Sequence, residues 1–128
     1  MASLEREPPA SGPMVTGFAG NRFRVDGDIC ESGLWLTPEW SRAWDACTLD
    51  RLDPAALDPL LAITPRPEFL LFGTGSKLQH PPPAFTRAIE ALSIGIEAMD
   101  SRAAARCWGL LRGEGRWFVA ALMPLDQV

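Results

Sequence analysis

The amino-acid sequence predicts a single α/β domain of three layers with a central mixed sheet. The second half carries this prediction, because its elements follow the order strand, helix, strand, helix, strand, which implies βαβ crossovers and largely parallel pairing. The first half shows short segments of alternating polarity, which predict an antiparallel β meander. The length of 128 residues favours one domain with a core of its own.

The meander is predicted from a series of short features of the first half. Arg22 to Val25 alternates basic and apolar side chains, the period of a half-buried strand. Asp26-Gly27 follows as a two-residue hairpin signal, since glycine accepts a positive φ without penalty. Ile29 and then residues 34–36 resume the sheet. After a turn at Pro38-Glu39, residues 40–46 predict another strand.

Two Asp-Pro pairs mark the segment that connects the halves. Asp53-Pro54 and Asp58-Pro59 each read as an N-cap followed by proline at the first helical position. A regular helix through Pro59 would lose a hydrogen bond and clash. We therefore expect a short turn at Pro54 and a brief helix that ends near Ile63.

The second half contains three apolar strands and two amphipathic helices. Residues 68–72 form an apolar run typical of a strand buried on both faces, and residues 94–99 and 116–123 predict two more strands. The first helix is indicated by apolar residues at helical spacing: Phe85, Ala88, Ile89 and Leu92. The second helix is capped by Asp100 or Ser101 and ends at Gly113-Glu-Gly115. Its apolar residues repeat the same spacing: Ala104, Cys107, Trp108 and Leu111.

Composition predicts the nature of the two chain ends and argues against several classes of function. The polar, Pro-rich residues 1–14 predict a disordered tail without the apolar stretch of a secretory signal, followed by the domain at 15–124 and a short tail at 125–128. The net charge of −4 argues against a nucleic-acid-binding face. No apolar run approaches the length of a membrane span.

The cysteines and the histidine argue against metal chemistry. Cys30, Cys47 and Cys107 are odd in number and lack a CxxC or zinc spacing, and His80 is the one histidine. We therefore predict no metal centre, no cofactor, reduced structural thiols and a cytoplasmic location. His80 has no serine or cysteine near it in sequence, and no catalytic set is recognised.

One loop is a candidate ligand site. Gly73, Thr74, Gly75, Ser76 and Lys77 follow a buried strand, the position at which open α/β sheets bind ligands. Successive peptide N–H groups could hold a small anion or nucleotide, and Lys77 is the only lysine in the chain. The loop matches neither a Walker A motif nor a dinucleotide fingerprint. The alternative is a tight turn that needs glycine for backbone reasons.

Asp100 and Arg102 extend this candidate site. Asp100 ends the next strand and lies on the same rim as Gly73 if the strands are parallel. Arg102 and Arg106 are four residues apart and share a helix face, so a basic pair beside Asp100 could bind an anion. The alternative is an N-capping aspartate with two solvated arginines.

Three tryptophans form the second candidate site. Trp35, Trp40 and Trp44 lie close together in the predicted β region, and a small domain has limited capacity to bury all of them. Partly exposed tryptophan is a common anchor of protein interfaces. The alternative is that these side chains fill the core.

The ordered combination of motifs in the second half resembles a known family. Phe69-Leu-Leu-Phe-Gly-Thr-Gly75, the proline run 81–83 and Gly95-Ile-Glu-Ala-Met-Asp100 with Ser101-Arg-Ala-Ala are similar to the domain of mitochondrial complex I assembly factor 3 and its uncharacterised bacterial and archaeal relatives. The likeness runs from about Thr16 to Met123. It implies a three-layer α/β fold and no established enzymatic activity. For the eukaryotic members it implies a role in complex I assembly through protein contacts.

Two hypotheses follow. The first is a non-catalytic accessory domain that binds another protein, which rests on the tryptophans and on the resemblance. The alternative is a small-anion or nucleotide-binding protein, or an enzyme, with its site at the Gly73–Lys77 loop. Where many relatives carry a cysteine after the Asp-Ser-Arg stretch, this chain has Ala105, so a nucleophile is not carried over to that position.

Overall fold

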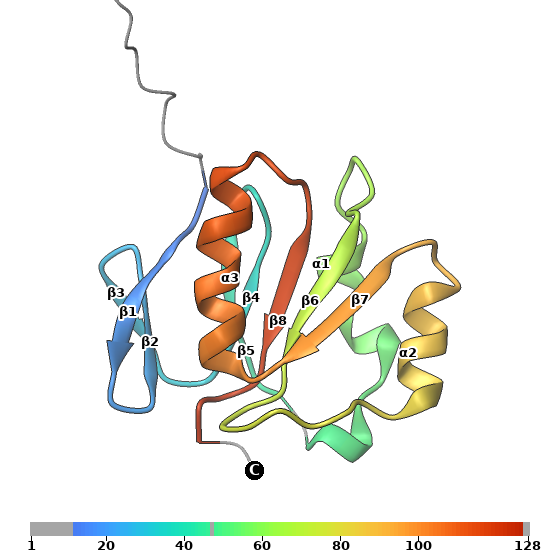
Figure 1. Ribbon diagram of the computed structural model, residues 1–128, viewed down its shortest axis with the longest axis horizontal. Helices are drawn as coiled ribbons and strands as arrows, with labels where there is room; N and C mark the ends of the chain where they lie inside the picture. The colour runs from blue at the N-terminus through green and yellow to red at the C-terminus, as the bar shows by residue number, and fades with distance from the viewer. Residues whose placement is uncertain (1–11, 47, 127–128) are drawn as a thin grey trace, which may run out of the picture.

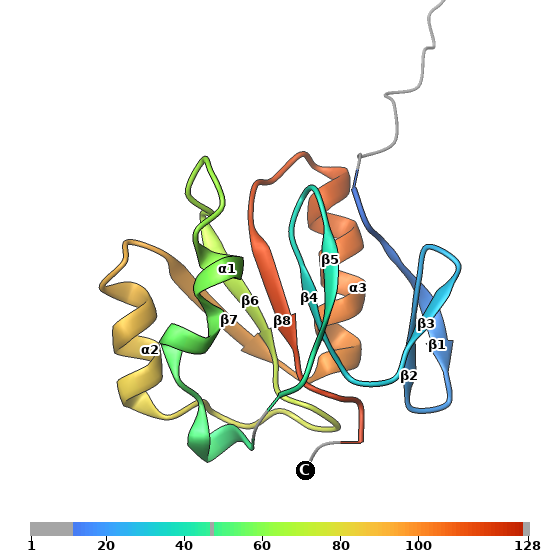
Figure 2. The ribbon, with the colours of Figure 1, turned by 180° about the vertical axis from the view of Figure 1, so that it is seen from behind.

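The computed structural model describes residues 12–46 and 48–126 and confirms the predicted α/β class. Eight strands lie in two sheets, a five-stranded mixed sheet of order β5-β4-β8-β6-β7 and a three-stranded antiparallel sheet of order β1-β2-β3. Figures 1 and 2 show the smaller sheet beside the β5 end of the larger one. The strands are β1 (Val15–Ala19), β2 (Arg22–Val25), β3 (Asp28–Cys30), β4 (Gly33–Leu36), β5 (Ser41–Trp44), β6 (Phe69–Gly73), β7 (Gly95–Met99) and β8 (Val119–Leu122).

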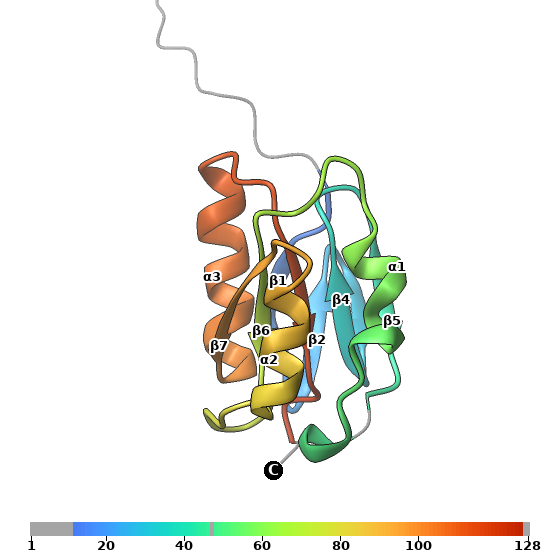
Figure 3. The ribbon, with the colours of Figure 1, turned by 90° about the vertical axis from the view of Figure 1, so that its right-hand side faces the viewer.

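Helices cover both faces of the five-stranded sheet. The helical elements are two short 3₁₀ turns, η1 (Leu49–Arg51) and η2 (Pro54–Leu57), and three α-helices, α1 (Asp58–Leu61), α2 (Pro83–Glu90) and α3 (Ser101–Gly113). Strands β7 and β8 flank β6 on opposite sides and run parallel to it, so the crossovers through α2 and α3 proceed in opposite directions. Because such crossovers share one handedness, the two helices lie on opposite faces of the sheet (Figure 3).

The central strand β6 shows why the second half folds as its sequence predicts. Leu70, Leu71 and Phe72 are all fully buried, with Leu70 and Phe72 in the core cluster on the α1–α2 side and Leu71 in the cluster on the α3 side. Successive side chains of a strand point to opposite faces, so a continuous apolar run supplies both cores. Trp108 of α3 anchors the second cluster.

The first half departs from a single meander. The Asp26-Gly27 hairpin joins β2 and β3 as expected, with Val25 paired to Asp28. However, β4 leaves this sheet and pairs antiparallel with both β5 and β8. Gly33 permits the close approach, because a Cβ atom there would lie 2.8 Å from the Trp44 carbonyl oxygen and 2.9 Å from that of Leu122.

Both predicted tails reach into the fold. Of the predicted disordered tail 1–14, residues 1–11 lie outside the described residues, whereas Pro13 is buried and its carbonyl accepts a hydrogen bond from the Trp108 indole N–H (2.9 Å). Of the predicted tail 125–128, Leu125 is buried in the α3-side core, and residues 127–128 lie outside the described residues. A hydrogen bond to Pro13 and apolar packing of Leu125 therefore hold the chain beyond the two predicted ends of the domain.

Candidate functional site

The glycine loop and Asp100 lie on one rim, as the parallel pairing of β6 with β7 requires. Gly73 pairs with Met99, so the loop after β6 and the start of α3 are adjacent. Asp100 is the N-cap of α3, and its carboxylate accepts a hydrogen bond from the Ala103 N–H (2.8 Å). This contact is the usual role of an N-capping aspartate.

Hydrogen bonds within the protein occupy the start of the loop. The Thr74 N–H donates to the Met99 carbonyl (2.8 Å), and the Gly75 N–H donates to the buried Ser101 hydroxyl oxygen (2.9 Å). That hydroxyl donates in turn to the Met123 carbonyl (2.7 Å), which ties the loop to the end of β8. The Thr74 hydroxyl donates to the Lys77 carbonyl (2.7 Å) and closes the turn. Two amides needed for an anion nest are thus directed at protein acceptors.

The end of the loop is solvent-exposed, whereas Arg102 contacts the β1–β2 hairpin. Ser76 and Lys77 are exposed, whereas Gly73, Thr74 and Gly75 are buried. Arg102 donates to the Gly20 carbonyl (3.2 Å), and its guanidinium lies 5.6 Å from the centre of the Phe18 ring. Arg102 therefore contacts the β1–β2 hairpin. The structure brings Gly73 and Asp100 to one rim, while the guanidinium of Arg102 is held at the hairpin.

This arrangement predicts the response of the loop to anions. Because the Thr74 and Gly75 amides donate to Met99 and Ser101, we expect millimolar phosphate to leave the amide resonances of residues 73–77 in place. A ¹H–¹⁵N titration with phosphate, and sodium chloride as the matched ionic-strength control, measures this. Saturable phosphate-specific shifts of Thr74 and Gly75 would instead establish an anion site.

The tryptophan cluster divides between core and surface. Trp35 and Trp44 are 6% and 8% exposed, and their ring centres lie 6.2 Å apart in the core on the α1–α2 side. Trp40 is only partly buried against the same core. The Arg42 guanidinium lies 4.7 Å from the Trp40 ring centre, a cation–π distance. Trp40 is thus the member of the cluster that retains exposed surface, with Arg42 beside it.

Two cysteines can be placed, and neither has the surroundings of an activated nucleophile. Cys30 and Cys107 are partly buried free thiols, and Cys47 lies outside the described residues. Burial raises the pKa of the Cys107 thiol, and the charges of Glu97 and Glu114 raise it further. The described residues also contain no group of three or more His, Cys, Asp or Glu side chains placed to hold a metal ion.

The raised pKa of Cys107 makes a measurable prediction. A raised pKa keeps the thiol protonated and less nucleophilic at about pH 8. We therefore expect iodoacetamide to alkylate Cys107 more slowly in the native protein than in urea, with the peptide resolved by mass spectrometry. The native rate should rise as the pH increases further. Equal rates in the two states would contradict this account.

A cleft of about 520 Å³ lies between the smaller sheet and the β4–β5 edge of the larger one. Its lining comes from β2, β3, β4, β5 and the turns beside them: Val25, Asp26, Asp28, Ile29, Cys30, Glu31, Ser32, Leu34, Ser41, Arg42 and Ala43. None of these residues was predicted from the sequence to belong to a site. The one sequence signal for this cleft is the acidic residues within and next to β3, namely Asp26, Asp28 and Glu31. They border a cleft only because the two sheets are separate in the folded chain.

Comparison with solved structures defines the class of fold. The chain superposes on a Bordetella parapertussis protein with a TM-score of 0.80 and 30% identity, covering 91% of this chain and 99% of that one. It also superposes on a Bordetella pertussis Mth938-like domain with a TM-score of 0.78 and 26% identity, covering 98% and 94% of the two chains. The protein therefore has a Mth938-like α/β fold.

The family follows from the sequence. Residues 15–123 match the family described as "Protein of unknown function (DUF498/DUF598)", and the chain belongs to this family. An uncharacterised Rhodobacter capsulatus protein is 32% identical over 121 residues, covering 94% of this chain and 92% of that protein. Bovine NADH dehydrogenase [ubiquinone] 1 alpha subcomplex assembly factor 3 is 26% identical over 121 residues, covering 94% of this chain and 65% of its own length. The resemblance to the assembly-factor family is confirmed.

No helix in the described part of the chain combines the length and the apolar character that a membrane crossing requires.

Proposed function

We propose that this protein is a non-catalytic, protein-binding module that assists the assembly of a multi-subunit NADH dehydrogenase. The observation that carries the proposal is the 26% identity to bovine assembly factor 3 over 94% of this chain. The likeness extends over nearly all of this chain and over 65% of the length of the assembly factor.

Two features of the surface support a binding role. The partly exposed Trp40 ring with Arg42 stacked above it has the chemistry of an interface anchor, since tryptophan and arginine dominate the binding energy of many interfaces. The amides of Thr74 and Gly75 at the glycine loop donate to protein acceptors, which favours a structural turn over a ligand cradle. The smaller sheet and the β4–β5 edge also frame an open cleft.

Deletion of the gene in its host tests the proposal. We expect the amount of assembled NADH dehydrogenase on native gels to fall severalfold, while the transcripts of its subunits remain unchanged. The wild-type gene supplied in trans should restore assembly. Chemical cross-linking in the complemented strain should link this protein to a subunit or assembly intermediate of that enzyme.

A matched pair of variants separates binding from folding. Arg42→Ala removes the exposed guanidinium beside Trp40, and Arg87→Ala removes an exposed arginine from the opposite end of the sheet, on α2. We expect Arg42→Ala to restore assembly less well than Arg87→Ala at equal protein levels. Unchanged NADH dehydrogenase in the deletion strain would refute the assembly role.

A further inference from the structure

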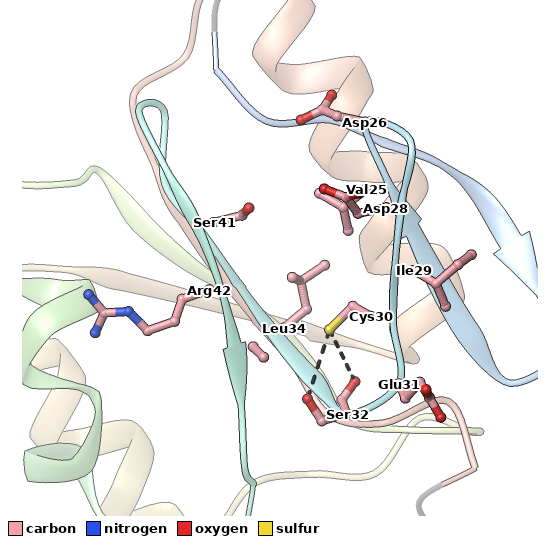
Figure 4. A pocket seen from close by; sticks show the side chains of 11 residues that line it. Val25, Asp26, Asp28, Ile29, Cys30, Glu31, Ser32, Leu34, Ser41 and Arg42 are labelled. Carbon is pink, nitrogen blue, oxygen red and sulfur yellow. Dashed lines mark hydrogen bonds between the residues drawn. The ribbon is translucent and has the colours of Figure 1, made fainter.

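The cleft between the two sheets is bordered by two strand edges. Three consecutive residues of β3, Asp28 to Cys30, line it, and so do three consecutive residues of β5, Ser41 to Ala43. Successive side chains of a strand point to opposite faces, so a cleft that touches every residue of a strand lies along its edge. Figure 4 shows the two strands on opposite sides of the open space.

Both edges lack a neighbouring strand in the described part of the chain. Strand β3 pairs with β2 alone, and β5 pairs with β4 alone. The Thr37 N–H donates to the Trp40 carbonyl (2.8 Å) next to the β4–β5 turn. Since bonded and non-bonded pairs alternate along an antiparallel ladder, the main-chain groups of Ser41 and Ala43 point away from β4. They form a row of donors and acceptors that an additional strand could use.

The cleft carries an uneven charge. Asp26, Asp28 and Glu31 line it. The Asp26 carboxylate accepts a hydrogen bond from the Met14 N–H (3.2 Å), whereas the carboxylates of Asp28 and Glu31 have no hydrogen-bond or ion-pair partner among the residues that the structure describes. Arg42 is the one basic residue of the lining, and its side chain extends away from the cleft toward Trp40 (Figure 4). The Asp28 side chain points into the space and the Glu31 side chain lies on the far side of β3 (Figure 4), so the border of the cleft is acidic and its one basic side chain is directed away from it.

The base of the cleft is apolar. Leu34 of β4 is 2% exposed and Val25 of β2 is 7% exposed, while Ile29 at the rim is 41% exposed. A strand presents alternate side chains to its two faces, so a segment in the cleft could place one set on this apolar base and the other near the carboxylates. The surface therefore favours a segment in which basic and apolar residues alternate.

We propose that the cleft binds an extended, basic segment of a partner protein as an added β-strand. Main-chain hydrogen bonds to Ser41 and Ala43 of β5 supply the binding energy, and the carboxylate of Asp28, at the acidic border of the cleft, selects lysine or arginine side chains. The apolar residues of the segment lie over Val25 and Leu34, which are only 7% and 2% exposed and therefore add little to the binding energy. This inference rests on the proposed function, because it names the surface and the kind of partner through which a binding module would act.

A synthetic peptide of alternating arginine and valine tests the inference with the full chain. We expect saturable binding that weakens as the salt concentration rises, because exposed charges are screened. Hydrogen exchange at the Ser41 and Ala43 amides should slow in the complex. A peptide of alternating glutamate and valine, with the same strand propensity and opposite charge, should not bind.

Variants separate the charge from the strand edge. Asp28→Asn removes the carboxylate from an exposed position, and we expect affinity to fall about threefold, as one exposed charge pair allows. Glu114→Gln, at the end of α3, is the matched control and should leave affinity unchanged. Ala43→Pro removes an outward N–H from an edge strand, where proline is tolerated, and should abolish the slowed exchange at this edge.

The remaining outcomes contradict the inference. Amides protected at β7, the other edge strand of the larger sheet, would place binding elsewhere. Protection of Ser41 and Ala43 in the free protein would mean that the chain's own residues or a second copy occupy the edge, and sedimentation distinguishes these cases. Equal affinity of the carboxylate variant would remove the charge argument. Failure of peptide binding with loss of NADH dehydrogenase on gene deletion would refute this cleft and leave the proposed function in place.

Discussion

Replacement of Trp108 by alanine is expected to destabilise the protein by about 3–5 kcal/mol, the usual cost of removing a large aromatic side chain from a core. Trp108 is fully buried, and its ring centre lies 4.7 Å from that of Phe118. Its indole N–H also donates to the Pro13 carbonyl (2.9 Å), so the substitution removes the attachment of the N-terminal segment to α3. Urea unfolding measured by circular dichroism gives the free-energy change.

Two further substitutions separate the contributions of Trp108. Trp108→Phe keeps an aromatic ring and loses the hydrogen bond to Pro13, so we expect a smaller loss and faster hydrogen exchange at Asp26, whose N–H donates to the Met14 carbonyl (3.0 Å). Leu110→Ala is the control on the same helix, because Leu110 is 68% exposed and should change stability by less than about 0.5 kcal/mol. A loss for Trp108→Ala no larger than that for Leu110→Ala would show that α3 is not anchored in this way.

Replacement of Gly73 by alanine is expected to cost about 1–3 kcal/mol, the range for inserting a methyl group into a packed interior. A Cβ atom at this position would lie 2.8 Å from the Ser101 Oγ and 2.9 Å from the Ser101 Cα. The Ser101 Cα belongs to the backbone of α3, so relief requires α3 to move away from β6. The same movement would strain the bonds from the Ser101 hydroxyl to Gly75 and Met123. Urea unfolding measures the loss.

Gly109→Ala is the matched control and should change stability in the opposite direction. Gly109 lies inside α3, and a Cβ atom there would have no neighbour within 4 Å. Alanine lowers the entropy of the unfolded chain and favours helix, so we expect a gain of about 0.5–1 kcal/mol. If Gly73→Ala proved neutral, the packing explanation of the glycine loop would fail.

The C-terminal half of the fold is predictable because its signals are local. The run from Phe69 to Gly73, the Asp100 cap and the spacing of Ala104 and Trp108 each depend on residues within one element. Right-handed crossovers then place α2 and α3 on opposite faces of the sheet. The division of the first half into two sheets depends on contacts between Gly33, Trp44 and Leu122, which are distant in sequence. No local pattern reports such contacts.

The candidate sites were less predictable for the same reason. Sequence placed the glycine loop at a strand end, yet the partners of its amides come from Met99 and Ser101. Sequence grouped three tryptophans, yet Trp35 and Trp44 pack into the core and Trp40 retains exposed surface. Whether a polar or aromatic group is available to a ligand depends on what the rest of the chain places against it.

Local sequence patterns suffice to predict the α/β class, the two crossovers and the Asp26-Gly27 hairpin, because hydrophobic period, capping and turn chemistry act over a few residues. The family resemblance rests instead on the ordered motifs of the second half. Only the folded chain shows that β4 joins β8, that the Gly75 amide donates to Ser101, and that two free strand edges face one another across an acidic cleft. These features are set by close packing between distant segments. A long-range approach such as that of Gly33 to Leu122 becomes visible only when the whole chain is folded.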